Sequence, residues 1–169
     1  MEEIQTAPGK LRIAFCTETP SKTEPNADVQ RVFDDTVKLL GELGHTMIEK
    51  RTLPIDWRTL YRAQGCVSGA MFAAAIDELI ATQGREPLDE EMEPLAWASY
   101  KGGRKITASQ VGWGLGQLRL MSRQILSLWR EFDVLLMPVT ITQAPPIGHL
   151  DPGKVEPKEF NRRQARVFG

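Results

Sequence analysis

The hydrophobic pattern of the first 50 residues predicts a strand, a helix and a second strand. Residues 11–17 form a short apolar run of β-favouring type. Apolar side chains then recur at steps of three and four from Val29 to Leu43, which places them on one face of a helix. Residues 46–49 are the second strand candidate. This spacing is that of a βαβ unit, so the two strands are predicted to be parallel.

The ends of this first helix are predicted from individual residues. Asn26 is a typical N-cap residue, and Asp28 follows in the first turn, where the helix dipole favours a carboxylate. Gly44 is of the type that ends a helix at the C′ position. The helix covers one face of the predicted sheet, whereas a parallel sheet needs cover on both faces. Later segments or a partner must therefore cover the other face.

Residues 56–132 carry a helical pattern. This pattern predicts an Ala-rich helix over 62–81, a short acidic helix over 88–98 and the longest helix of the chain over 106–132. Breaks between the helices are predicted at 84–87 and at Gly102-Gly103. Thr107 is the expected N-cap of the longest helix. Residues 133–138 follow directly and predict a buried parallel strand.

The pattern stops after Pro138. Residues 139–169 hold four prolines and no helical or strand period, so they are predicted to be loop or the lead-in to a further element. The expected organisation is one segment with three parts: a βαβ unit over 1–52, a helical region over 53–132, and a strand with a Pro-rich loop over 133–169. The predicted fold class is α/β, with a helical insert between the βαβ unit and a further strand.

Composition narrows the classes of partner. The 169 residues hold 21 Lys and Arg against 22 Asp and Glu, and this balance argues against a nucleic-acid binder. Two cysteines cannot form a disulfide framework, which favours a reducing compartment. The acidic N-terminus lacks signal-peptide features, and the continuous apolar runs are shorter than a membrane span. We expect a cytoplasmic protein that contacts neither nucleic acid nor membrane.

The two histidines predict neither a metal site nor a catalytic base. His45 lies at the end of the first predicted helix, where the partial negative charge favours an imidazolium. His149 has Asp151 two residues further on, which is too few ligands for a metal ion. No metal and no cofactor are predicted.

Other candidate motifs also have a structural interpretation. The glycines of 112–116 have the wrong spacing for a dinucleotide loop and lie within a helical stripe, so they are predicted to be helix-packing positions. Ser68 does not lie in a G-x-S-x-G motif and is predicted to be a small packing residue, while Cys66 lacks an activating partner. The acidic run 89–93 is interpreted as a solvated helix N-terminus.

Two stretches resemble the amidase signature family, the Ser–cis-Ser–Lys amidohydrolases. The first is LRIAF at 11–15, followed by a helix that ends in LGELGHTM at 40–47. The second is FDVLLMPVT at 132–140 with APPIG at 144–148. Both resemble segments of the family, in the same order, and the opening is similar to amidases of the 6-aminohexanoate cyclic-dimer hydrolase type. The resemblance implies that the chain is part of the larger mixed-sheet fold of these enzymes.

The resemblance implies hydrolysis of a carbon–nitrogen amide bond through an acyl-serine intermediate, without a cofactor. The family's nucleophilic Ser, cis-Ser and Lys lie upstream of the matching segment, and this chain has no Ser-Ser pair and no Gly-Gly-Ser run. No catalytic residue is therefore assigned. The chain is expected to be the later-middle part of a longer enzyme, inactive alone.

Substrate-binding residues are expected after the last predicted strand. Ligands of parallel α/β sheets lie outside the carboxyl ends of strands, and the resemblance places the loop near the acyl pocket. Pro138, Val139 and Thr140 are the predicted substrate-binding residues. The expected partners are an amide substrate in the full-length enzyme and further copies of the chain, recruited by open strand edges. Two alternatives stay open: a flavodoxin-like module that binds a small molecule, and an interaction module that completes its sheet with a partner.

Overall fold

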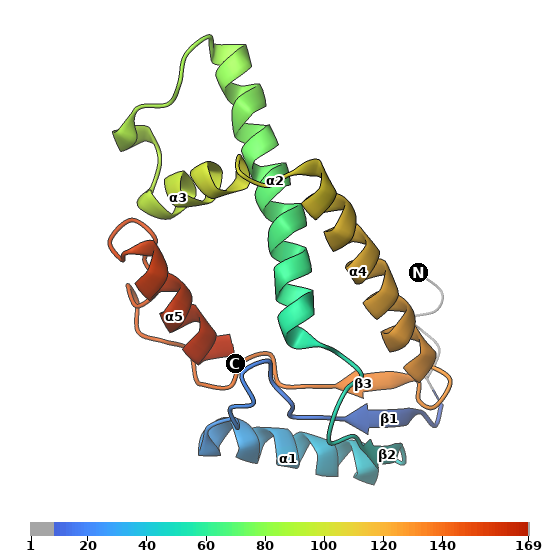
Figure 1. Ribbon diagram of the computed structural model, residues 1–169. Helices are drawn as coiled ribbons and strands as arrows, with labels where there is room; N and C mark the ends of the chain where they lie inside the picture. Colours follow the sequence, from blue (N-terminus) through green and yellow to red (C-terminus); the bar gives the residue numbers. More distant parts are fainter. Residues whose placement is uncertain (1–8, 169) are drawn as a thin grey trace. The chain divides into compact units, whose positions relative to one another are not determined.

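A computed structural model describes residues 9–168 of the chain (Figure 1). These residues form two compact units. The first, here called the sheet unit, comprises 9–54, 124–144 and 166–168. The second, here called the helical unit, comprises 55–123 and 145–165. Each unit is described separately below.

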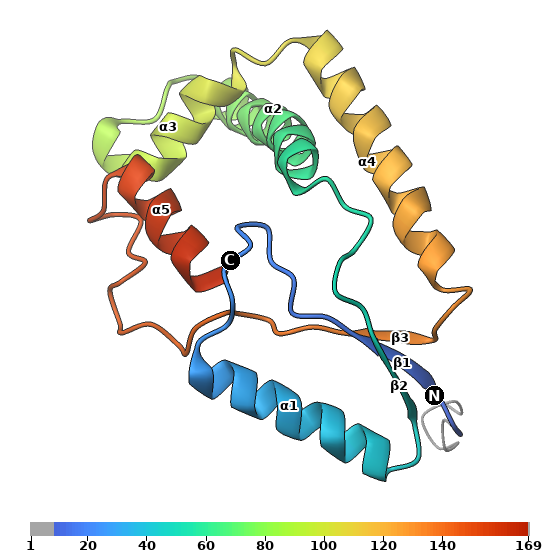
Figure 2. The same ribbon diagram turned by 60° about the horizontal axis from the view of Figure 1, so that its bottom comes forward.

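The sheet unit contains a three-stranded parallel sheet with the order β2-β1-β3. Its elements are β1 (Arg12–Phe15), α1 (Ala27–Glu42), β2 (Thr46–Glu49) and β3 (Val134–Leu136). α1 connects the neighbouring strands β1 and β2, and β3 pairs with the other side of β1 (Figure 2). The predicted βαβ unit and third parallel strand are confirmed, although β1 and β3 are shorter than the apolar runs 11–17 and 133–138. Self-association through the outer edges of this sheet stays a prediction.

Both predicted ends of α1 are confirmed. The Asn26 side chain accepts a hydrogen bond from the Val29 backbone N–H at 2.9 Å, which satisfies one of the unpaired donors at the helix start. Gly44 adopts φ +93°, a left-handed conformation that glycine reaches without steric cost. The chain reverses at this glycine and enters β2.

An arginine–aspartate pair joins the start of β1 to the residue before β3. Asp133 accepts the Arg12 backbone N–H at 2.8 Å and the Arg12 guanidinium through both carboxylate oxygens, at 3.3 and 2.8 Å. Arg12 also donates to the Arg130 carbonyl at 3.2 Å. The guanidinium holds the pKa of Asp133 below its usual range, because it hydrogen-bonds to the charged form. This pair aligns the two strands at one end.

The His45 ring contacts the backbone just before β1. The Leu11 backbone N–H donates to His45 Nδ1 at 3.2 Å. The ring therefore links the entrances of β1 and β2.

The helical unit contains α2 (Trp57–Gln83), the 3₁₀-helix η2 (Asp89–Glu91), α3 (Pro94–Gly103), and most of α4 (Ala108–Leu128) and α5 (Pro157–Phe168). The predicted acidic helix over 88–98 is wrong, because Pro94 starts a separate helix at its first position, where the missing N–H costs nothing. The predicted break at Gly102-Gly103 is confirmed, because α3 ends at Gly103 and α4 begins at Ala108.

Close contacts between helices explain some of the glycines. In α3, a Cβ on Gly103 would overlap the Gly69 carbonyl oxygen of α2 and lie 2.8 Å from Ala73 Cβ. In α4, a Cβ on Gly114 would lie 2.8 Å from the Ala63 carbonyl oxygen of α2. The packing role predicted for the glycines of 112–116 therefore holds for Gly114. It does not hold for Gly112 and Gly116, which have open space at the Cβ position.

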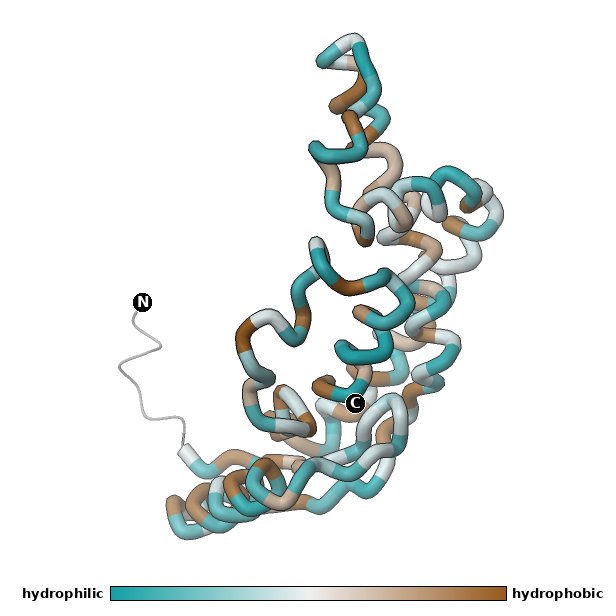
Figure 3. Tube along the Cα trace, turned by 90° about the vertical axis from the view of Figure 1, so that its left-hand side faces the viewer, coloured by the Kyte–Doolittle hydropathy of each residue, from teal (hydrophilic) through white to brown (hydrophobic). Residues whose placement is uncertain are grey.

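The segment after β3 contains a helix that the sequence pattern did not predict. α5 begins at Pro157 and ends at Phe168, within the range predicted as loop. Figure 3 shows most of its trace in the colours of hydrophilic residues. Glu159 accepts a hydrogen bond from Arg163 at 3.0 Å, one turn later, so ion pairing supports this helix, which has few apolar residues.

One helix of the described residues, α2, is long and apolar enough to cross a membrane by length and composition alone. The lengths of the continuous apolar runs did not indicate this helix, because its apolar residues are interspersed with small and polar residues. Core helices of soluble proteins pass the same test.

Candidate substrate-binding site

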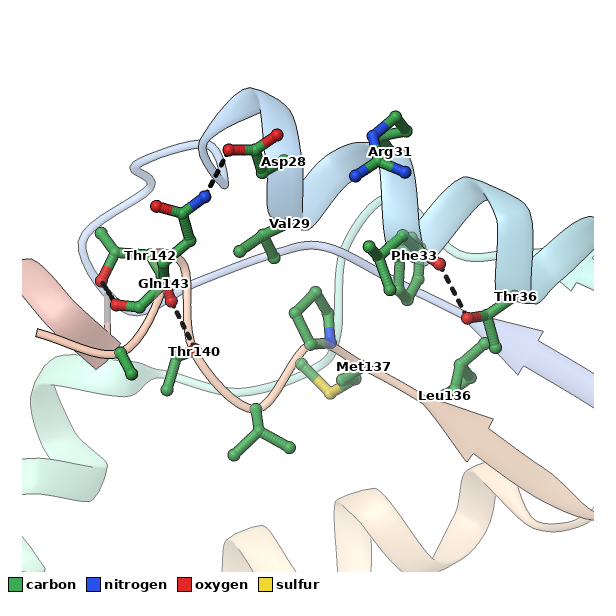
Figure 4. A pocket seen from close by; sticks show the side chains of 14 residues that line it. Asp28, Val29, Arg31, Phe33, Thr36, Leu136, Met137, Thr140, Thr142 and Gln143 are labelled. Atoms are coloured by element: carbon green, nitrogen blue, oxygen red, sulfur yellow. Dashed lines mark hydrogen bonds between the residues drawn. The ribbon is translucent and has the colours of Figure 1, made fainter.

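An open trough of about 590 Å³ lies in the sheet unit at the carboxyl end of β3 (Figure 4). One wall is the face of α1 between Asp28 and Thr36. The other is the chain that leaves β3, residues 136–144, here called the trough segment. The carboxyl ends of parallel strands are the usual place for ligands in open α/β sheets.

The trough is mainly apolar, with polar groups along it. Its apolar lining comprises Val29, Val32, Phe33, Leu136, Met137, Pro138, Val139 and Ala144. Its polar lining comprises Asp28, Arg31, Thr36, Thr140, Thr142 and Gln143. Phe33 is 7% exposed and Val139 is 89% exposed, so the trough extends from the protein core to open solvent. This combination suits a ligand with a hydrocarbon part and a small number of hydrogen-bonding groups.

The trough segment is held in place through Ile141, which is buried. The Ile141 carbonyl accepts the Asn26 N–H at 2.8 Å, and the Ile141 N–H donates to the Val167 carbonyl at 3.0 Å. Asn26 is the N-cap of α1, and Val167 lies in the last turn of α5, where helix carbonyls lack partners within the helix. Two helix ends thus fix one residue of the segment, while its neighbours face the trough.

The three residues predicted from the sequence all line this trough. Pro138, Val139 and Thr140 follow one another along the trough segment. The Thr140 hydroxyl donates to the Thr142 carbonyl at 2.8 Å, so its oxygen keeps lone pairs that can accept a hydrogen bond from a ligand. The α1 wall was not predicted. Its signal in the sequence is an apolar stripe that continues from Phe33, which is buried, to Val32, which is 54% exposed.

The remaining candidate residues do not form a second site. Asp151 accepts the Gly153 N–H at 3.0 Å and pairs with Lys154 at 3.2 Å, while the His149 carbonyl accepts from Arg163. Among residues 9–168, no three His, Cys, Asp or Glu side chains are grouped as metal ligands would be. Burial raises the pKa of the Cys16 thiol, which disfavours the reactive thiolate.

The acidic run 89–93 is organised by an arginine. Arg85 donates to both carboxylate oxygens of Glu91, at 2.7 and 2.8 Å, and the Leu88 N–H adds a third hydrogen bond at 2.8 Å. These bonds lower the pKa of Glu91 to about 2. The carboxylate is therefore ionised and fully engaged in stabilising the turn between α2 and η2.

Comparison with known families shows which family the chain belongs to. The Amidase family model matches residues 1–165 of the chain. The chain belongs to the amidase family. Its resemblance to amidase signature enzymes, first seen in the segments around 11–15 and 132–140, is thereby confirmed.

Individual relatives agree with this assignment. The amidase chain is 27% identical to a lipoamidase of Enterococcus faecalis over 139 residues, which cover 81% of this chain and 19% of the relative. Its fold is similar to that of 6-aminohexanoate cyclic dimer hydrolase, solved in complex with substrate, with a TM-score of 0.73 and 20% identity. A bacterial aryl acylamidase of the amidase signature family gives a TM-score of 0.66 and 14% identity.

The amidase chain spans only part of these proteins. The match with 6-aminohexanoate cyclic dimer hydrolase covers 90% of this chain and 32% of that enzyme. The match with the aryl acylamidase covers 86% of this chain and 30% of that enzyme. The chain spans about a fifth of the lipoamidase. The described residues form an α/β structure with a small parallel sheet and five α-helices, which is consistent with a part of the larger amidase signature fold.

Proposed function

We propose that this chain forms part of the acyl-binding pocket of an amidase that hydrolyses carbon–nitrogen amide bonds, and that it is inactive on its own. The observation that carries the proposal is the apolar trough at the carboxyl end of β3, lined by Pro138, Val139 and Thr140. In the whole enzyme, an acyl chain would lie along the trough while the amide carbonyl is attacked by a serine that this chain does not supply.

The serines of the chain support the second part of the proposal. Catalysis by serine requires an adjacent base that removes the hydroxyl proton. The hydroxyls of Ser68, Ser99 and Ser127 instead donate to backbone carbonyls of their own helices, at 2.7, 2.8 and 2.6 Å. Among the described residues, no hydrogen bond joins a serine hydroxyl to a histidine or lysine side chain.

The isolated chain is therefore expected to hydrolyse no amide. The test is incubation with a panel of acyl anilides of different chain lengths, together with a fluorophosphonate probe that labels activated serines. We expect no turnover and no labelling, because no serine hydroxyl among residues 9–168 hydrogen-bonds to a basic side chain that could activate it. Stoichiometric labelling of one serine that tracks with the purified chain would overturn this part of the proposal.

Ligand binding at the trough is expected to depend on the space at Thr140. We expect hexanamide to shift backbone amide signals of 136–144 in ¹H–¹⁵N spectra. Thr140→Trp should weaken this binding at least ~10-fold, because the indole occupies the volume of several methylenes, each worth ~1–3 kcal/mol in an apolar pocket. Thr52→Trp, at an exposed residue that does not line the trough, is the matched control. Equal weakening by both variants would remove Thr140 from the binding surface.

A further inference from the structure

A hydrogen bond connects the two walls of the trough at one end. The Gln143 side-chain amide donates to the Asp28 carboxylate, although the two residues are 115 positions apart in the sequence. Asp28 lies in the first turn of α1, and Gln143 lies on the trough segment, so the bond crosses from one wall to the other (Figure 4). The adjacent backbone bond from Asn26 to Ile141 adds a second link between the same walls.

The opposite end of the trough has no such link among the described residues. Thr36 is the last α1 residue of the lining, and its hydroxyl donates to the Val32 carbonyl of its own helix at 2.7 Å. The trough is therefore bridged beside Asp28 and unbridged beside Thr36. A straight chain that enters from the Thr36 end would meet the polar Asp28–Gln143 pair.

The length between these ends can be stated from helix geometry. Thr36 lies eight positions after Asp28, which at 1.5 Å of rise per residue corresponds to about 12 Å. An extended hydrocarbon advances about 1.25 Å per carbon, given bonds of about 1.5 Å at about 111°. The apolar part of the trough therefore suits a straight chain of roughly nine carbons.

We propose that the Asp28–Gln143 hydrogen bond is an end-stop that sets the greatest length of straight aliphatic acyl chain that the trough binds. The inference rests on the proposed acyl-binding function of the trough. A methylene that reaches this pair meets the two bridged polar side chains instead of further apolar lining, so a longer chain gains nothing. Both side chains are exposed, and substitution here leaves the buried side chains of the unit in place.

The test is titration of the chain with straight-chain primary amides of four to twelve carbons, followed in ¹H–¹⁵N spectra. Affinity should rise about four-fold per added methylene and stop rising near nine carbons. Gln143→Ala and Gln143→Glu both break the bond, and affinity should then continue to rise by at least two further carbons. Combining Asp28→Asn with Gln143→Glu exchanges donor and acceptor, and should restore the original limit.

A second Gln–Asp pair on α1 provides the control. Gln30 donates to Asp34 at 2.8 Å, and neither residue lines the trough. Gln30→Glu removes the same type of bond and should leave the chain-length limit unchanged. The inference is overturned if the limit is the same in the wild type and in both Gln143 variants. Amides that cause no shifts in the trough residues at any length would contradict the proposed function itself, and the two failures are thereby distinguished.

Discussion

Replacing Phe132 with alanine is expected to destabilise the sheet unit by about 3–5 kcal/mol, the usual cost of removing a fully buried aromatic side chain. Phe132 is 0% exposed. It lies two residues before β3, and its ring meets the Trp129 ring edge-on with the centroids 5.0 Å apart. Alanine would leave a cavity at the entrance to β3 that the paired strands cannot collapse to fill. Urea unfolding followed by circular dichroism measures the loss.

The control for this prediction is Phe168→Ala in the same unit. Phe168 is 48% exposed, so the identical substitution should cost clearly less, about 1 kcal/mol. Equal losses for the two variants would contradict the argument that the burial of Phe132 causes the effect.

Replacing Gly103 with alanine is expected to destabilise the helical unit by about 3 kcal/mol, at the upper end of the usual cost of overpacking. The new Cβ would overlap the Gly69 carbonyl oxygen and press on Ala73 Cβ, both on α2. A backbone carbonyl cannot rotate away as a long side chain can, so α3 must move off α2. The measurement is again urea unfolding, with the midpoint and slope compared between variants.

The neighbouring glycine provides a matched control. Gly102 also lies in the last turn of α3, but a Cβ there meets nothing within 4 Å. Gly102→Ala should therefore be neutral or stabilising by up to about 1 kcal/mol, because alanine favours the helix over glycine. A destabilisation by Gly102→Ala as large as that by Gly103→Ala would show that helix-end geometry, and not the contact with α2, explains the effect.

Local patterns predicted the elements whose signals are contained in a few neighbouring residues. The stripe from Val29 to Leu43, with Asn26 before it and Gly44 after it, is sufficient for α1, because capping and face formation are local. Prediction was wrong for α5 and for the acidic segment. α5 is amphipathic, but it has few apolar residues and lies in a Pro-rich stretch that favours a loop. The acidic segment is divided by the helix start at Pro94.

Three residues of the candidate site were predicted in the same way. Pro138, Val139 and Thr140 follow a recognisable strand, and the end of a parallel strand is a ligand position in most folds of this kind. The α1 wall could not be predicted, because no local sequence pattern indicates that Asp28 contacts Gln143. That pairing depends on β3 joining β1 after a helical region of more than 70 residues has intervened.

The sequence by itself determined the parallel βαβ unit, the third strand and the membership of the amidase family, because short-range periodicity and two sequence segments carry that information. Only the tertiary structure decided which glycines lie at close contacts between helices. Gly102 and Gly103 are neighbours of the same residue type, but only Gly103 lies against α2. The tertiary structure also decided the second wall of the trough. Contacts between residues more than a hundred positions apart arise when strands pair and helices pack. A local sequence pattern therefore does not predict them.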